Sequence, residues 1–367
     1  MNIGIITFHA AHNYGSMLQA YALQTYLEKQ GHRVEIINFR TQHQKSMYSK
    51  PISFKNLHQI KQTIKLFLYD VTSIKAITTK WNIFEDFLSA NLHLTKEYNT
   101  LDELRKAHFK YDYIITGSDQ IWNTKAQDFS EAYFATFTSD IKKIAYAPSM
   151  GPEPEVQDVN YIKQMLTGYK AVSVREKRTK DFLENNNIYH PVEIVLDPTM
   201  LLDEKDYIGL YSQEPLIKGQ YIFYYTPGGI RPEFMTIAQK IGEKYNLPVI
   251  TEGSYYPQEI KPYKNFKQYL TVGPSEFLNL VKHATVVCGA SFHLIVFSII
   301  FQKEFYCING DVDSRMNNLM RLLSTEDRIL KENETINSSL ERKINWDEVF
   351  SKISTLRKKT DVFFDEL

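Results

Sequence analysis

The sequence predicts an α/β protein with two Rossmann-like domains that face a cleft. The chain has 367 residues, which is too many for one ordinary hydrophobic core, so two domains are expected. It opens with a strand–loop–helix–strand pattern, and short apolar runs that end in polar or glycine-rich residues recur as far as residue 308. A strand–helix–strand unit implies parallel strands, because the helix carries the chain back to the same edge of the sheet.

The first such unit begins the chain. Residues 3–8 form an apolar run typical of a buried strand, and a polar loop follows at 9–15. Ser16 can cap the next helix, in which apolar residues recur at helical spacing, and Gly31 stands where a C-cap belongs. Residues 34–39 are then predicted to form the second strand.

A polar, lysine-rich segment interrupts the strands at about residues 41–110. Its helical pattern, with an apolar stripe around Trp81, predicts a helical excursion from the first domain rather than a domain of its own. Strands typical of a parallel sheet then return, and each runs into polar or glycine-rich residues. They are predicted at residues 113–115, 143–147, 171–174 and 193–196.

A second α/β set begins near residue 220. We therefore place the first domain at residues 1–205 and the second at 206–345. Residues 346–367 are predicted to form an amphipathic helix that packs back on the first domain. The strands of the second domain are predicted at residues 221–225, 247–250, 285–288 and 304–308.

Composition excludes several classes of protein. Basic and acidic residues balance at 43 each, which argues against a general nucleic-acid binder. Cys288 and Cys307 lie in apolar runs and are expected to be reduced core residues. We find no signal-peptide pattern, and the longest apolar run, at residues 294–301, is too short to span a bilayer. A cytoplasmic protein is therefore expected.

The common signatures of nucleotide binding are absent from the sequence. Neither a G-x-x-x-x-G-K-[ST] loop nor a G-x-G-x-x-G turn after a strand occurs, which argues against a P-loop kinase and a nicotinamide oxidoreductase. Histidines and cysteines do not cluster at metal-ligand spacing, so no metal site is expected.

The strongest local feature is the turn that begins at Gly289. A strand enters this turn and a helix follows, with Ser291 as its expected cap and His293 in its first turn. The N-terminus of a helix can bind an anion, because its N–H groups and its dipole favour negative charge. Lys303 follows the same helix. The alternative is a capped core helix with a histidine on its rim.

Two other segments offer polar groups at strand ends. Arg175 directly follows a predicted strand, and its guanidinium suits a carboxylate or a phosphate. The alternative for this residue is an ion pair with Glu176 or another nearby acid. Asn13 and Tyr14, in the loop after the first strand, can face the same rim of the sheet.

The loop at residues 117–123 also follows a strand. Asp119, Gln120, Trp122 and Asn123 supply hydrogen-bond acceptors, donors and a ring face, which together suit a carbohydrate. The alternative is a structural loop in which the aspartate caps the following turn and the tryptophan fills a gap.

Taken together, these segments resemble the polysaccharide pyruvyl transferase family. Each is weak alone, but the ordered set is specific and extends from the first strand to about residue 323. The matching segments are residues 7–9, 13–24, 117–123, 146–151, 173–176, 196–199, 291–293 and 301–303.

The resemblance implies a fold like that of the two-Rossmann-domain (GT-B-like) glycosyltransferases, with the acceptor on the first domain and the donor on the second. It implies phosphoenolpyruvate as co-substrate, without a cofactor or metal, and a saccharide acceptor of bacterial surface, exopolysaccharide or capsule biosynthesis. The donor-binding residues it implies are Arg175, Gly289, Ser291, His293 and Lys303, of which Arg175, His293 and Lys303 are catalytic. Ala290 and Leu294 stand where many members have an acidic and a small residue.

The implied reaction is formation of a pyruvate ketal with loss of phosphate. His293 is the implied general acid/base, since imidazole titrates near neutral pH, at about 6.5. The implied acceptor-binding residues are Asn13, Tyr14, Asp119, Gln120, Trp122 and Asn123. The acceptor can be free or lipid-linked, which would bring the protein to the inner face of the membrane. A homo-oligomer is compatible with the sequence.

Two alternatives stay open at this point. The first is a glycosyltransferase that uses a nucleotide sugar on the same fold. The second is a saccharide-binding relative without catalytic activity. Binding of nucleotide diphosphate favours the first, and binding of sugar without any response to a phosphorylated donor favours the second.

Overall fold

A computed structural model describes residues 1–49, 60–61, 71–152, 154–252, 260–331 and 343–365. The chain divides into two compact units. The first unit consists of Met1–Tyr48, Leu88–Leu202 and Ile353–Leu367, and the second of Ser49–Phe87 and Asp203–Lys352. Each unit is described by itself below.

The first unit contains a six-stranded sheet in the order β2-β1-β3-β4-β5-β6, with every neighbouring pair parallel. All six strands coincide with runs that the sequence predicted. Their bounds are β1 Asn2–Ile6, β2 Arg33–Ile36, β3 Tyr113–Thr116, β4 Lys142–Ala145, β5 Tyr169–Val174 and β6 Val192–Ile194.

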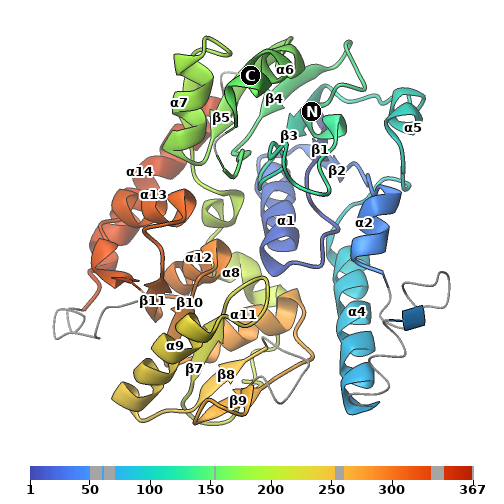
Figure 1. The fold of residues 1–367 in the computed structure, drawn as a ribbon. Coiled ribbons are helices and arrows are strands. Elements are labelled where there is room, and N and C mark those ends of the chain that lie inside the picture. Colours follow the sequence, from blue (N-terminus) through green and yellow to red (C-terminus); the bar gives the residue numbers. More distant parts are fainter. Residues whose placement is uncertain (50–59, 62–70, 153, 253–259, 332–342, 366–367) are drawn as a thin grey trace. The chain divides into compact units, whose positions relative to one another are not determined.

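Most of these strands are connected by α-helices, whereas the connection between β3 and β4 contains only a 3₁₀ turn. The helix α7 packs on β5 and β6, and it lies beside β5 in Figure 1. The helices of the first unit are α1 Tyr14–Lys29, α2 Gln42–Met47, α5 Leu101–Arg105, α6 Val159–Met165 and α7 Lys177–Asn185, with short 3₁₀ turns at Glu131–Phe134, Val156–Asp158 and Pro198–Leu201.

The second unit also contains a parallel six-stranded sheet, in the order β12-β11-β10-β7-β8-β9. The short strands β9 and β12 were not predicted, because they have three and two residues and no apolar run marks them. The strands are β7 Ile222–Tyr225, β8 Val249–Thr251, β9 Phe266–Gln268, β10 Val286–Gly289, β11 Glu304–Ile308 and β12 Ile329–Leu330.

In this unit α9 packs on β8 and β10, and α12 packs on β10 and β11 (Figure 1). The helix α12 is apolar on all sides and every one of its residues is buried, which is typical of a central helix of an α/β core. The helices are α8 Glu204–Tyr207, α9 Pro232–Tyr245, α11 Pro274–His283, α12 Phe292–Ile300 and α13 Ser314–Leu322, with 3₁₀ turns at Ile208–Leu210 and Glu326–Arg328.

Two long helices have residues in both units. The helix α4 (Val71–Asn91) lies in the second unit up to Phe87, and α14 (Trp346–Asp365) lies in the first unit from Ile353. The sequence had assigned the whole 41–110 segment to the first domain, whereas the described residues between Ser49 and Phe87 belong to the second unit. Within the first unit, α14 is held by Tyr26, whose hydroxyl donates to Asp361 at 2.6 Å.

Each unit has its own hydrophobic core around its sheet. In the first unit Ile114, Ala145 and Val172 pack with rings such as Tyr133, and in the second Ile222 is at the centre. Two parallel sheets with flanking helices confirm the predicted class, an α/β fold of two Rossmann-like domains.

Candidate functional site

Both sheets have a point where the strand order reverses, and the predicted motifs lie there. In the first sheet the reversal is between β1 and β3, and in the second between β7 and β10. The connections leave these neighbouring strands in opposite directions, so their carboxyl ends open a crevice in which α/β proteins bind ligands. Residues 7–16 and 117–119 follow β1 and β3, while residues 226 and 290–293 follow β7 and β10.

Arg175 lies at the centre of a buried cluster in the first unit. It directly follows β5, and its side chain is only 1% exposed. One guanidinium nitrogen, Nη1, donates to Asp197 Oδ2 at 2.8 Å, and the other, Nη2, donates to Asp119 Oδ1 at 3.2 Å. Its Nε lies 3.8 Å from Glu176 Oε2. Three carboxylates therefore surround one guanidinium.

Hydroxyl groups complete the coordination of these carboxylates. Ser16 Oγ donates to Asp119 Oδ2 at 2.6 Å, and Ser149 Oγ donates to Glu176 Oε1 at 2.7 Å. Burial alone would lower the pKa of Arg175, but Asp119, Asp197 and Glu176 outweigh it, so the pKa is raised.

This geometry corrects the expectation that Arg175 holds the donor. A buried guanidinium that already pairs with three carboxylates has no face to offer an incoming carboxylate or phosphate. The structure matches the alternative that the sequence left open, pairing with Glu176 and nearby acids. Arg175 therefore positions Asp119, and through it the loop that follows β3.

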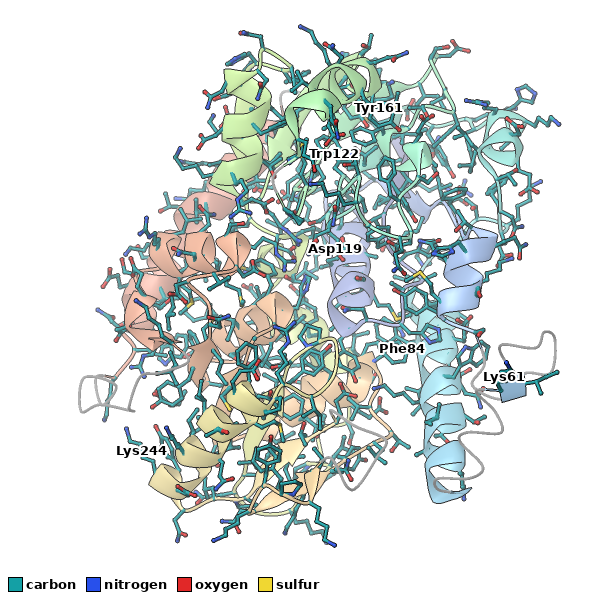
Figure 2. The ribbon with its side chains drawn as sticks, viewed as in Figure 1. Lys61, Phe84, Asp119, Trp122, Tyr161 and Lys244 are labelled. Atoms are coloured by element: carbon teal, nitrogen blue, oxygen red, sulfur yellow. The ribbon has the colours of Figure 1, made fainter. Side chains whose placement is uncertain are left out.

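Gly117 and Asp119 fix the conformation of the loop after β3. Gly117 has a φ of +126°, and a Cβ atom there would lie 2.0 Å from the carbonyl oxygen of Tyr146, so only glycine fits. Asp119 Oδ1 also accepts from the backbone N–H of Gln120 at 2.8 Å. Asp119 is 8% exposed and lies beside α1 (Figure 2).

Trp122 does not present a ring face, which corrects its predicted contact with a sugar. The residue is fully buried, its Nε1 donates to the carbonyl of Tyr133 at 3.2 Å, and its ring stacks on Phe134 with centroids 4.9 Å apart. It fills the core beneath the loop. The side chains of Gln120 and Asn123 are half-buried and converge on Gly151.

The first loop differs from its prediction in the residue that caps the helix. Asn13, not Ser16, is the N-cap of α1, because its Oδ1 accepts from the backbone N–H groups of Gly15 at 2.9 Å and Ser16 at 3.3 Å. Tyr14 is buried, at 2% exposure. Asn13 and Tyr14 thus form the start of the helix, and Ser16 is left to bind Asp119.

Sequence reasoning missed a group of polar residues near Asp119. The rings of His12 and Tyr48 stack with centroids 5.6 Å apart, and Gln44 Nε2 donates to the hydroxyl of Tyr133 at 2.8 Å. Burial raises the pKa of Tyr48 to about 12, with contributions from Asp128 and Asp119.

Asp128 completes this group. Burial, and then the charge of Asp119, raise the pKa of Asp128, although a hydrogen bond from Gln44 opposes the shift. A capping box at Thr41 and Gln44 was a signal for the helix α2. No pattern marked Asp128 itself.

The second unit brings Gly289, Ser291 and His293 together. Gly289 ends β10 with a φ of +156°, and a Cβ atom there would lie 1.9 Å from the carbonyl oxygen of Tyr225, the last residue of β7. Ser291 caps α12, since its Oγ accepts from the backbone N–H of Leu294 at 3.4 Å. His293, which is 8% exposed, lies in the first turn and contacts the ring of Phe292 edge-on.

Lys303 lies at the opposite edge of this sheet. It precedes β11, and β11 pairs with β10 so that Glu304 faces Val286 and Cys307 faces Gly289. Its Nζ donates to the carbonyl of Lys282 at 3.0 Å, and burial, with the charge of Lys282, lowers the pKa of Lys303. The structure therefore does not bring Lys303 to the edge that carries His293, although the sequence had grouped them.

Other features of the described residues bear on the site only indirectly. Cys288 and Cys307 are buried and neither is in a disulfide, as expected of core residues. A cavity of about 370 Å³ lies at the amino-terminal edge of β1 and β2, where Asn2 and Arg33 line it, and thus away from the motifs. Among the described residues, no helix is long and apolar enough to cross a membrane.

Solved structures that are similar to this chain include two glycosyltransferases and an epimerase. An α-glucosyltransferase in complex with UDP and a 13-mer DNA is 10% identical, with a TM-score of 0.50, and covers 98% of this chain and 90% of that one. The glycosyltransferase SnogD from Streptomyces nogalater is 11% identical, with a TM-score of 0.43, and covers 98% and 95%. UDP-GlcNAc 2-epimerase from Neisseria meningitidis is 10% identical, with a TM-score of 0.48, and covers 99% and 93%.

The family comparison is more specific. No curated protein matches the chain at a significant level. The sequence profile described as polysaccharide pyruvyl transferase matches residues 13–312, which include the segments after β3 and β10 described above. The chain therefore belongs to the polysaccharide pyruvyl transferase family.

Proposed function

We propose that the protein transfers the enolpyruvyl unit of phosphoenolpyruvate to two hydroxyls of a saccharide and releases phosphate. The observation that carries the proposal is the family match over residues 13–312. The acceptor is a saccharide, free or lipid-linked, of bacterial surface, exopolysaccharide or capsule biosynthesis. The lipid-linked form would bring the protein to the inner face of the membrane.

The reaction balances without an external oxidant or reductant. C2 of phosphoenolpyruvate gains two bonds to saccharide oxygens and loses its bond to phosphate, while C3 gains one proton. The diol loses two protons, of which one corresponds to the proton gained at C3 and the other leaves with phosphate.

The carboxyl edge of the second sheet supports donor binding there. The N-terminus of α12 presents the positive end of its dipole, and Gly289 keeps side chains away from the backbone at this turn. In the proposal His293, in the first turn of α12, is the general acid that protonates C3. Lys303 lies at the other edge, and the proposal gives it no contact with the donor.

The carboxyl edge of the first sheet supports saccharide binding. Gln120 and Asn123 are half-buried amides that can donate and accept hydrogen bonds, and the Asp119 loop holds them in place. The proposal uses Trp122 and Arg175 only as supports of this loop.

The test uses phosphoenolpyruvate with a panel of methyl glycosides that differ in their free diols. The expected result is release of phosphate together with a glycoside heavier by one pyruvate less one water. His293→Gln should lose this activity at an unchanged melting midpoint, and Lys282→Gln, on the opposite edge, is the control. Release of a nucleotide from a nucleotide sugar, with no ketal in any reaction, would replace the proposal by a glycosyltransferase.

Thermal melting in the presence of a ligand tests donor binding independently of catalytic activity. A ligand that binds only the folded state raises the melting midpoint. Phosphoenolpyruvate should raise the midpoint of the wild type, and the rise should persist in Arg175→Met after correction for its lower starting midpoint. A rise with nucleotide diphosphate alone would contradict the proposed donor.

A further inference from the structure

We propose that the cavity at the amino-terminal edge of β1 and β2 binds a neutral saccharide unit, at the opposite end of β1 from the loops that follow β1 and β3. The cavity has a volume of about 370 Å³, and ordinary ligand pockets measure about 300–1,000 Å³. All of its lining residues belong to the first unit. The inference goes beyond the proposed transfer, since it assigns a second place at which the protein holds a sugar.

The floor of the cavity is one face of β1 and β2. In the register of these strands Asn2 lies beside Arg33 and Gly4 lies beside Glu35, and residues two apart in a strand point to the same face. Asn2 and Arg33 are the first residues of their strands. Because β1 has five residues, its two ends are roughly 13 Å apart. The cavity and the proposed saccharide-binding loop are therefore two different sites.

An aromatic wall lies over this floor. The Tyr111 ring lies directly on β1, because Gly4 has no Cβ atom, and one placed there would be 2.5 Å from Cε2 of that ring. Phe109 stacks on Tyr111 with centroids 5.5 Å apart, and Tyr98 meets Phe109 edge-on, also at 5.5 Å. Each ring is held by the next, so the wall is formed before a ligand binds. Aromatic surface of this kind packs against the C–H groups of a sugar ring.

The polar groups of the cavity include a carboxylate that is fixed and still able to accept. The Tyr111 hydroxyl donates to Glu35 Oε2 at 2.9 Å, which leaves Oε1 of this half-buried side chain for a ligand. Burial, and then this hydrogen bond, raise the pKa of Tyr111, so the hydroxyl keeps its proton and remains a donor. Among the residues that the structure describes, neither Glu35 nor Arg33 forms an ion pair, although both lie on the same face of β2.

This combination of groups suits a neutral polyol better than an ion. A simple anion would use Arg33 and Lys110 but not Glu35, and a simple cation would use Glu35 alone. A sugar uses both charges, because each hydroxyl can donate to the carboxylate or accept from the guanidinium. The side-chain amide of Asn2 adds one more donor and acceptor at the same edge. Donors and acceptors that converge beside an aromatic wall are typical of a sugar site.

The experiment measures how methyl glycosides of neutral hexoses protect Lys110 from acetylation by acetic anhydride. Lys110 is exposed and lines the cavity, so a bound sugar should cover its ammonium group. Lys106, an exposed lysine of the same unit outside the cavity, is the internal reference. The full chain is labelled at increasing glycoside concentration, digested and analysed by mass spectrometry. We expect protection that saturates at Lys110 and is absent at Lys106.

Two variants test the named contacts. Glu35→Gln should raise the half-saturating concentration about tenfold or more, because a hydrogen bond to a charged group contributes at least this factor. Its single amide oxygen still accepts from Tyr111, so the wall stays in place while the sugar loses its acceptor. Asn2→Trp should abolish protection by filling the cavity. Glu193→Gln, which changes an exposed glutamate of β6, is the matched control and should behave as wild type.

The outcomes decide the proposal without any measurement of turnover. Absence of protection at Lys110, or equal protection in wild type and Glu35→Gln, would overturn it. Protection by inorganic phosphate and not by the glycosides would also overturn it and would indicate an anion site. Melting midpoints identify a variant that has failed to fold, and if Asn2→Trp fails in this way, Glu35→Gln alone decides. Loss of the proposed transfer activity would leave this test intact, and a result against the cavity would leave the proposed transfer intact.

Discussion

Substitution of Arg175 by methionine tests whether the guanidinium compensates the buried carboxylates. Methionine keeps much of the side-chain volume but removes the charge and both hydrogen bonds, to Asp197 at 2.8 Å and to Asp119 at 3.2 Å. Asp119, Glu176 and Asp197 would then remain close together and uncompensated. We expect the first unit to lose much of its stability.

The magnitude follows from the burial of this cluster. Removal of one partner from a buried ion pair costs about 3–5 kcal/mol in the free energy of unfolding. In a domain of this size 1 kcal/mol moves the melting midpoint by about 2–4 °C, so the expected decrease is about 6–20 °C.

The assay is thermal melting of the full chain, with Arg178→Ala as the matched control. Arg178 is exposed on the next helix, so its loss should change the unfolding free energy by no more than about 0.5 kcal/mol. Equal midpoints for Arg175→Met and Arg178→Ala would refute the reasoning. So would a stable Arg175→Met protein that no longer responds to phosphoenolpyruvate, since that result would make Arg175 a donor ligand.

Three further predictions concern the second unit, the stability contribution of Asp128 and the metal requirement. Gly289→Ala should lower the melting midpoint by several degrees more than Gly228→Ala, because both glycines have positive φ but only Gly289 would place a methyl group 1.9 Å from a carbonyl oxygen. Asp128→Asn should be at least as stable as wild type at pH 7 and lose that advantage below about pH 4, since the raised pKa of Asp128 makes its ionised form costly in the folded state; a lower midpoint at pH 7 would contradict this. Ketal formation should be unchanged after treatment with EDTA, and a loss that Mg²⁺ restores would show a metal requirement.

Much of the fold could be predicted because its strands are buried on both faces. Such strands appear in the sequence as continuous apolar runs, as in Ile222–Tyr225, and a run of this kind can be recognised without knowledge of distant contacts. The strands β9 and β12 escaped prediction because only tertiary pairing makes them strands. The division of α4 between the two units also depends on tertiary packing, and the spacing of apolar residues along the sequence gives no information about that packing.

The site was predicted at the level of segments and less well at the level of side chains. The sequence identified the loops after β3 and β10 because turns after parallel strands carry ligands. It could not tell that Arg175 faces three acids or that Trp122 points inward, because side-chain direction after a strand end depends on the backbone of the loop. The family resemblance implied that Lys303 joins His293 at the donor, yet the two residues lie at opposite ends of α12, which rises about 1.5 Å per residue.

The acidic character of the first unit's edge has a consequence for which molecules can approach it. Three carboxyl groups, those of Asp119, Glu176 and Asp197, lie there with the guanidinium of Arg175. Because three buried carboxyl groups share one guanidinium there, hydrogen-bond donors such as the hydroxyls of an uncharged sugar are favoured next to this cluster. The same charges that fix the loop after β3 can therefore also favour one class of acceptor.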